Sequence, residues 1–150
     1  MCSSDLADSL KFITPKGKVV YGGGGIIPDV FVPINKKMEN EIVNRILDRG
    51  IMSYFVFEDL DKDRSIYEGI NEEDFITDFV VSDALLNRFN DYLNARTRFK
   101  IVFVAYNDEI KFYIKATFAQ QLYGSEAYQK IVNTNDVMID KIKQLIQESK

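Results

Sequence analysis

Residues 12–21 read Phe-Ile-Thr-Pro-Lys-Gly-Lys-Val-Val-Tyr, which predicts two short strands joined by a turn. In Thr14-Pro15-Lys16-Gly17, proline fixes φ at the second turn position and glycine suits the fourth. A further strand is predicted at Val30 to Val32, where Pro28 and Pro33 confine it to an edge or mark its limits, since proline cannot donate to a ladder. An isolated hairpin is marginal in water. These strands therefore need a sheet that the rest of the sequence does not obviously supply.

The same region carries a family resemblance. Asp8 to Phe12, the turn from Thr14 to Gly17 and the motif Gly25-Ile26-Ile27-Pro28-Asp29 follow one another. Together they resemble the closing segment of the protease core of carboxy-terminal processing peptidases, also called tail-specific proteases. The resemblance is to forms with a long helical C-terminal extension, common in Bacteroidota, and Ala116 to Tyr128 is similar to that extension. It covers most of residues 8 to 148.

The resemblance implies that the full protein is a serine endopeptidase of the periplasm or cell envelope. Such an enzyme would cleave substrates near their C-termini and use a PDZ-like module for recognition. Its serine–lysine dyad, in which the lysine takes the serine proton and backbone amides hold the oxyanion, lies upstream of the Thr-Pro-x-Gly turn. No catalytic residue therefore carries over, and the chain alone is expected to be inactive. The implied partners are the missing upstream protease core and the protein substrates of the parent enzyme.

The first six residues, Met1 to Leu6, show no signal-peptide pattern. They are similar to a translated sequencing adapter, and the alternative is an ordinary disordered N-terminus. We favour a non-native scar and expect the true chain to extend upstream. The expected organisation is residues 1–6 as the scar, 7–34 as the end of the protease core and 35–150 as a helical accessory domain.

The composition excludes several classes of function. With 150 residues and 46% hydrophobic content, the chain can bury one core. A net charge of −4 gives no basic surface for nucleic acid or for anionic lipid. No apolar run approaches the roughly 18 residues of a transmembrane helix. The sequence has no histidine, which excludes histidine triads, bases and metal ligands, and its single Cys2 excludes an internal disulfide.

After Pro33 the apolar spacing changes to the helical period, which predicts a mainly α domain behind the short β segment. A first helix ends at Arg49-Gly50, with glycine as the cap. Ile51 to Asp59 is predicted to be a second, largely buried helix, with a strand as the alternative. Asn71 to Phe75 is expected to be a loop that leads into a short helix through Phe79. The inward residues expected of the first two helices are Met38, Ile42, Val43, Ile46, Leu47, Met52, Tyr54, Phe55, Val56 and Phe57.

The second half predicts further helices. Ser82 is an N-cap, and a long helix starts at Asn107 or Asp108 and ends at Gly124. Ser125 and Thr134 are expected to cap the last two helices, and Phe99 to Tyr106 is β-like. The inward faces are expected to carry Leu85, Leu86, Phe89, Tyr92, Leu93; Ile110, Tyr113, Ile114, Thr117, Phe118, Leu122; Ala127, Tyr128, Ile131; and Met138, Ile142, Leu145, Ile146.

Two patterns resemble ligand loops and fail their tests. Gly22 to Gly25 lacks the Lys-Ser/Thr and the following helix of a P-loop, and it lacks the spacing of a dinucleotide fingerprint. Asp59 to Asp63 resembles the start of a calcium loop, but Arg64 replaces the glycine of the sixth position and Ile70 the glutamate of the twelfth. We expect no phosphate, cofactor or metal site, and interpret Asp59 to Asp63 as a solvated helix end.

No catalytic group is predicted. Glu72-Glu73-Asp74 is expected to be open to solvent, which keeps carboxylates ionised. Lys11 lacks the spacing of the peptidase dyad. Four serines of the helical part are interpreted as helix or turn residues: Ser53, Ser65, Ser82 and Ser125.

Two hypotheses of different class follow. In the first, the chain is the C-terminal part of a serine endopeptidase. In the second, it is an independent helical interaction module whose N-terminal strands augment a partner's sheet.

Overall fold

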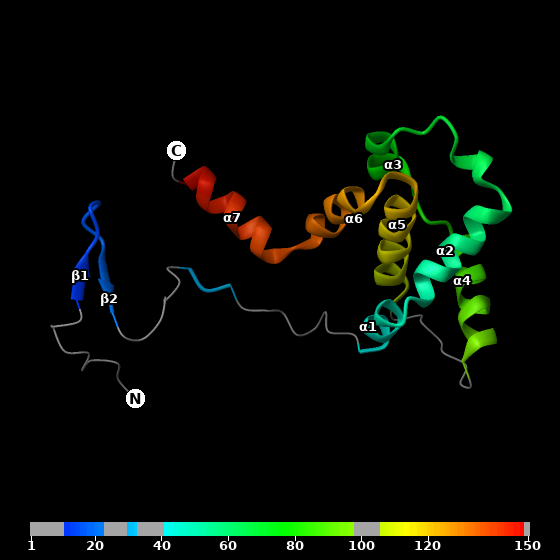
Figure 1. Ribbon diagram of the computed structural model, residues 1–150, viewed down its shortest axis with the longest axis horizontal. Coiled ribbons are helices and arrows are strands. Elements are labelled where there is room, and N and C mark those ends of the chain that lie inside the picture. The colour runs from blue at the N-terminus through cyan, green and yellow to red at the C-terminus, as the bar shows by residue number, and fades with distance from the viewer. Residues whose placement is uncertain (1–10, 23–29, 33–40, 98–105, 149–150) are drawn as a thin grey trace. The chain divides into compact units, whose positions relative to one another are not determined.

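The computed structural model describes residues 11–22, 30–32, 41–97 and 106–148 (Figure 1). The chain divides into two compact units, Met1–Pro33 and Ile34–Lys150. The predicted scar at residues 1–6, the glycine run beyond Gly22 and most of the β-like stretch from Phe99 to Tyr106 lie outside the described residues.

The first unit contains an antiparallel hairpin of β1 (Lys11–Ile13) and β2 (Val19–Tyr21), in which Phe12 faces Val20 in register. Its turn is held by the Gly17 N–H, which donates to the Thr14 carbonyl at 2.8 Å, and by the Thr14 N–H, which donates to the Lys18 carbonyl at 2.8 Å. Gly17 has φ +80°, a left-handed conformation that glycine adopts without strain. The predicted turn and the first two strands are confirmed.

The strand predicted at Val30 to Val32 is wrong, because these residues form a bend and irregular backbone. β1 and β2 pair with each other in a two-stranded sheet, and the described part of the chain has no further strand with which Val30 to Val32 could form backbone hydrogen bonds. β propensity without a partner does not make a strand.

The second unit is helical, so the prediction of a mainly α chain with a short N-terminal β segment is confirmed. Over its described residues it contains α1 (Glu41–Asp48), α2 (Ile51–Lys62), the short 3-10 helix η3 (Arg64–Tyr67), α3 (Glu72–Asp78), α4 (Asp83–Arg96), α5 (Asn107–Tyr123), α6 (Ser125–Val132), the 3-10 turn η5 (Asn133–Asn135) and α7 (Val137–Glu148). No helix among the described residues is long and apolar enough to span a membrane.

The core forms around α5, against which α2, α3, α4 and α6 all pack (Figure 1). Ile110, Ile114 and Phe118 of α5 are fully buried, as predicted, and so are Ala116 and Ala119, whose small side chains let neighbouring helices approach. An aromatic cluster closes one end, where Phe75 and Phe79 stack with ring centroids 4.3 Å apart. Thr117 is the one buried polar residue in the described core, and its hydroxyl donates to the Tyr113 carbonyl of its own helix at 2.7 Å.

Helix ends follow local chemistry. Gly50 has φ +66° after α1 and Gly124 has φ +103° after α5, which confirms both glycine stops. Ser82 is confirmed as the N-cap of α4, since its hydroxyl accepts from the Leu85 N–H at 3.2 Å. Asn71 caps α3 through the Asp74 N–H at 2.9 Å, so Glu72 to Asp74 form the first helical turn and the predicted loop is wrong.

Two predicted caps are wrong. Ser125 is the first residue of α6, with Gly124 at the cap position, and makes no side-chain cap. The Thr134 hydroxyl donates backwards to the Ile131 carbonyl at 2.7 Å. The Asp136 carboxylate takes its place and accepts from the Met138 N–H at 2.7 Å, because a carboxylate is a strong N-cap acceptor.

One predicted inward face is wrong, and a second is confirmed at Met52, Phe55 and Val56 but wrong for the rest of its residues. The last helix, α7, buries none of its residues, and Met138, Ile142 and Ile146 are each more than half exposed. Ile51 to Asp59 does form a helix, but Tyr54 and Phe57 face solvent, opposite the buried Phe55 and Val56. Helical spacing identifies an apolar face without showing that another element covers it.

Candidate functional site

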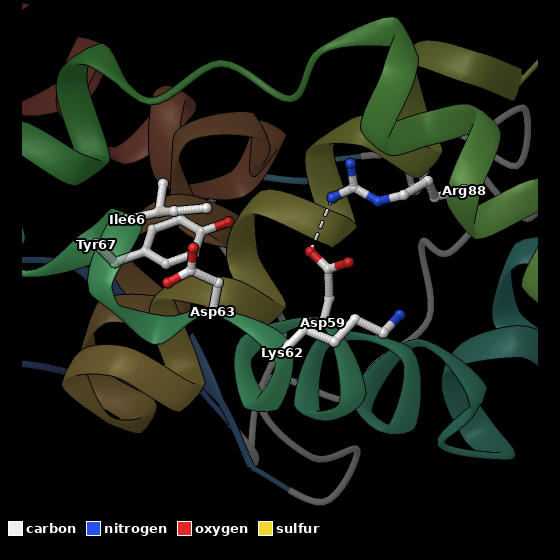
Figure 2. A pocket seen from close by; sticks show the side chains of 6 residues that line it. All are labelled: Asp59, Lys62, Asp63, Ile66, Tyr67 and Arg88. Atoms are coloured by element: carbon white, nitrogen blue, oxygen red, sulfur yellow. Dashed lines mark hydrogen bonds and ion pairs between the residues drawn. The ribbon is translucent and has the colours of Figure 1, made fainter.

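A hollow of about 280 Å³ lies where the end of α2, the helix η3 and the middle of α4 meet (Figure 2). We call it the acid–base hollow. Its lining combines three residues of the calcium-like segment with three that the sequence analysis did not connect to them: Asp59, Lys62 and Asp63, and then Ile66, Tyr67 and Arg88.

An ion pair forms the wall between α2 and α4. An Arg88 Nη2 donates to Asp59 Oδ2 at 2.9 Å, and the Asp59 side chain is only 9% exposed whereas that of Arg88 is 55% exposed. The interpretation of Asp59 to Asp63 as a solvated helix end is therefore wrong for Asp59. A nearly buried carboxylate needs this cation, because burying an unpaired charge is costly.

The opposite wall is Tyr67, whose ring also belongs to the aromatic core. Its ring centroid lies 5.5 Å from that of Phe118 and 6.0 Å from that of Phe79. Burial raises the pKa of the Tyr67 phenol, the charge of Asp59 raises it further, and Arg88 partly offsets both. The phenol therefore stays neutral and offers an O–H donor to the hollow.

Asp63 is occupied by a structural role. Its Oδ1 accepts from the Ser65 N–H at 3.1 Å and from the Ser65 hydroxyl at 2.5 Å, which starts η3. The calcium-loop resemblance also ends here, because Asp59 and Asp61 lie within α2, where alternate positions point to different sides. Within the described ranges, no group of three carboxylate or sulfur ligands could hold a metal ion.

The charges of the acid–base hollow balance. It holds the carboxylates of Asp59 and Asp63 and the cations of Lys62 and Arg88. Asp59 and Asp63 already accept hydrogen bonds, and the hollow presents no activated nucleophile beside a base. This arrangement suits the binding of a small polar group more than it suits catalysis.

A second hollow, of about 460 Å³, lies on the exposed side of α2. Tyr54 is 65% exposed and Phe57 61% exposed, and both line it together with Gly50 and Ser53. The signal was present in the sequence, since Tyr54 and Phe57 fall on the side of the helix away from Met52, Phe55 and Val56. The prediction of a largely buried helix did not distinguish this exposed side from the buried one.

A third cluster joins α2 to α4 at the surface. Glu58 Oε1 accepts from the Tyr92 hydroxyl and from Arg96, each at 3.0 Å. The Arg96 guanidinium also lies over the Tyr92 ring, 3.5 Å from its centroid. Burial, followed by the hydrogen bond to Glu58, raises the pKa of the Tyr92 phenol. The cluster is saturated by its own contacts and serves to pack the two helices.

The serines lie where a structural role predicts. Ser53 is inside α2, Ser65 inside η3, Ser82 at the cap of α4 and Ser125 at the start of α6. Glu72, the first of the acidic residues expected to be open to solvent, accepts from Lys130 at 2.7 Å. Lys11 lies in β1.

Comparison of the sequence with known protein families finds one match. A family model described as a family of unknown function, DUF8443, matches residues 42–124, which is more than half of the chain. This chain belongs to the DUF8443 family. The DUF8443 match spans the core helices α2 to α5 and includes both hollows, whereas the hairpin and α7 lie outside it. Comparison with curated proteins and with solved structures finds no match.

Proposed function

We propose that this chain is the C-terminal part of a serine endopeptidase that processes protein C-termini with a Ser–Lys dyad. The helical unit, which carries the DUF8443 segment, is then a non-catalytic accessory domain. The catalytic residues and the recognition module lie in the upstream part of the polypeptide, and that part binds the protein substrates. The expected compartment is the periplasm or cell envelope.

The observation that carries this proposal is the state of the hairpin. Phe12 is 59% exposed and Ile13 70% exposed, and Val19 and Val20 are each about two-fifths exposed. A two-stranded ribbon with apolar side chains in water is marginal and gains stability when further strands or a helix cover it. The Thr14 to Gly17 turn of this hairpin is also the turn that resembles the end of the peptidase core.

The helical unit fits a supporting role. The serines among its described residues cap or lie within helices, and Asp59 and Glu72 are each engaged by a cation. Among the described residues, the Ser65 hydroxyl donates to Asp63 and the Ser82 hydroxyl accepts from the Leu85 N–H, so their hydrogen bonds serve helix ends and not a lysine amine. Hydrolysis would therefore depend on residues supplied from upstream.

The test is the reading frame upstream of this chain, followed by labelling of the protein that it encodes. We expect the frame to continue upstream into a serine and a lysine at the spacing of the peptidase family. A fluorophosphonate probe for reactive serines should label the longer polypeptide and not this chain. Alanine at the upstream serine should abolish labelling while leaving the helical unit folded by circular dichroism. An in-frame stop directly upstream, or labelling of this chain alone, would refute the proposal.

The second candidate is an independent helical interaction module whose hairpin adds to a partner's sheet. The exposed Tyr54 and Phe57 on α2 favour it, because exposed aromatic residues around a hollow are common at protein interfaces. A native start codon with its ribosome site immediately before this chain would support this candidate over the first.

A further inference from the structure

Two helices of the helical unit, α2 and α7, each present apolar side chains to solvent along one of their own faces. On α2, the residues Gly50, Tyr54, Phe57 and Asp61 follow one another at intervals of four, three and four, which places them in one line. We call this line the α2 stripe. Its centre is the 460 Å³ hollow, and Gly50 has no side chain to keep another helix at a distance.

On α7, the residues Met138, Ile142 and Leu145 are spaced by four and three and form a matching line, the α7 stripe. Met138 is 52% exposed and Ile142 55% exposed. Ile146 lies beside this line and is 54% exposed. An amphipathic helix gains most of its stability from packing its apolar face, so the α7 stripe fits a surface that covers it.

The charges around the two stripes are opposite. Lys141 and Lys143 flank the apolar face of α7, and their contacts are the side chains of their own helix, with Lys141 3.5 Å from Gln144 and Lys143 3.7 Å from Asp140. Glu58 borders the α2 stripe but already pairs with Arg96, so the carboxylate that the stripe offers to a partner is Asp61 at its end. Within the described residues, no ion pair engages Asp61. Lysines beside one stripe and the Asp61 carboxylate at the end of the other favour pairing of these two faces.

We propose that the chain forms a dimer in which the α7 stripe of each copy docks on the α2 stripe of the other. Both helices contain 12 residues, so the faces match in length. The α7 aliphatic side chains fill the hollow between Tyr54 and Phe57, and a lysine beside the α7 stripe meets Asp61 at the end of the α2 stripe. One helix pair gives a small interface, and reciprocal exchange doubles the buried area toward the roughly 1,200 Å² of a stable complex.

A lipid surface is the less suitable partner for α7. Helices that lie on anionic membranes carry an excess of Lys and Arg on the polar face, whereas α7 has Asp140 and Glu148 among its polar residues. The net charge of −4 also opposes binding to an anionic bilayer.

The test is the mass in solution, measured by light scattering on a size-exclusion column over a range of concentrations. The full chain should shift from monomer to dimer as its concentration rises. Ile142→Asp and Phe57→Asp should each weaken dimerisation by about 100-fold, because each puts a charge at the centre of the contact. Gln147→Asp on α7 and Val80→Asp between α3 and α4 are the matched controls, since both put the same charge at an exposed position outside the two stripes, and both should dimerise as the unchanged chain does.

Mixing makes the assignment specific. The Ile142→Asp copy keeps an intact α2 stripe and the Phe57→Asp copy keeps an intact α7 stripe, so a mixed dimer has one unaltered contact and one contact that carries both aspartates. Neither variant can form an unaltered contact with itself. An equimolar mixture should therefore show a weak heterodimer, at higher concentrations than the unchanged chain needs for its dimer. If Phe57→Asp dimerises like the unchanged chain, α7 pairs with something other than α2 and the proposal is wrong. A full chain that stays monomeric at every concentration would also overturn the proposal. In that case α7 either packs on the α2 of its own chain or binds anionic vesicles, which a separate vesicle-binding assay would detect. Circular dichroism of each variant verifies that helix content is unchanged.

Discussion

Asp59 and Arg88 are 29 residues apart in the sequence, yet their side chains meet at 2.9 Å and join α2 to α4. The pair is asymmetric, because the carboxylate is 9% exposed and the guanidinium 55% exposed. Water can replace Asp59 as a partner of Arg88, but it cannot easily replace Arg88 as a partner of Asp59. Removal of the arginine side chain should therefore lower the free energy of unfolding more than removal of an ordinary surface ion pair does.

We predict that Arg88→Ala lowers the free energy of unfolding by about 1–3 kcal/mol, since it leaves a nearly buried carboxylate without its donor. The matched control is Arg45→Ala, which removes an exposed pair with Glu41 at 3.6 Å and should cost less than about 0.5 kcal/mol. Urea denaturation followed by circular dichroism measures both. Equal losses in the two variants would contradict the role given to Arg88.

Phe75 and Phe57 allow a second matched comparison, since both lie on helices and only Phe75 is buried. Phe75 is fully buried and stacks on Phe79 at 4.3 Å. We expect Phe75→Ala to lower the free energy of unfolding by about 3–5 kcal/mol through lost contacts and a cavity. Phe57→Ala, measured below the concentration at which the chain associates, should change it by about 0.5 kcal/mol or less. A large cost at Phe57 in the monomer would mean that this ring is covered within a single chain.

The buried tyrosines predict how stability changes at high pH. Burial raises the pKa of Tyr67, Tyr113, Tyr123 and Tyr128 above the ordinary value of 10.0. The folded chain thus keeps phenol protons that the unfolded chain releases. The resulting stability is fully present below pH 10 and is lost as the pH rises through the raised pKa values. Urea denaturation at a series of alkaline pH values, with tyrosinate absorbance as the titration signal, should show falling stability.

Tyr67→Phe provides the control for that pH dependence. Since phenylalanine does not ionise, this variant should lose less stability than the unchanged chain as the pH rises above 10. A steeper loss in Tyr67→Phe would show that ionisation of Tyr67 does not oppose folding.

The hairpin should be the less stable part of this chain. We predict that amides of β1 and β2 exchange with deuterium much faster than those in the middle of α5, because the hairpin leaves Phe12 and Ile13 exposed while Ile114 and Phe118 are fully buried. Hydrogen exchange read by mass spectrometry or NMR measures both regions in one sample. Hairpin amides as protected as those of α5 would mean that the two strands need no further sheet, which would weaken the endopeptidase proposal.

Local chemistry explains what the sequence predicted well. Gly50, Ser82 and Gly124 were assigned as helix ends from residue type and spacing alone, because their roles depend on their own backbone or on the next turn. The errors at Ser125 and Thr134 arose where several cap residues compete within a few positions. Asp136 makes the stronger cap, and a residue-type rule does not choose between such neighbours.

Long-range contacts could not be predicted in the same way. Nothing in the spacing of Asp59 and Arg88 indicates that they meet, since their approach depends on how α2 and α4 pack. The apolar faces of α2 and α7 were visible in the sequence, but the periodic pattern is the same whether or not another helix covers it. The acid–base hollow became evident only from the folded chain, and so did the exposure of Tyr54 and Phe57, whose position on the other side of the helix was already given by their spacing.

Thr117 is the one polar side chain buried in the described core, and its hydroxyl is satisfied within α5. Among the described residues, the alignment of the core helices therefore depends mainly on the shapes of aliphatic and aromatic side chains, and the Asp59–Arg88 pair adds a polar link between α2 and α4. Such an interior should accept several simultaneous apolar exchanges at constant volume. A library that shuffles Leu, Ile, Val and Met across these sites would be expected to keep many folded members, with their melting cooperativity declining before their helix content does.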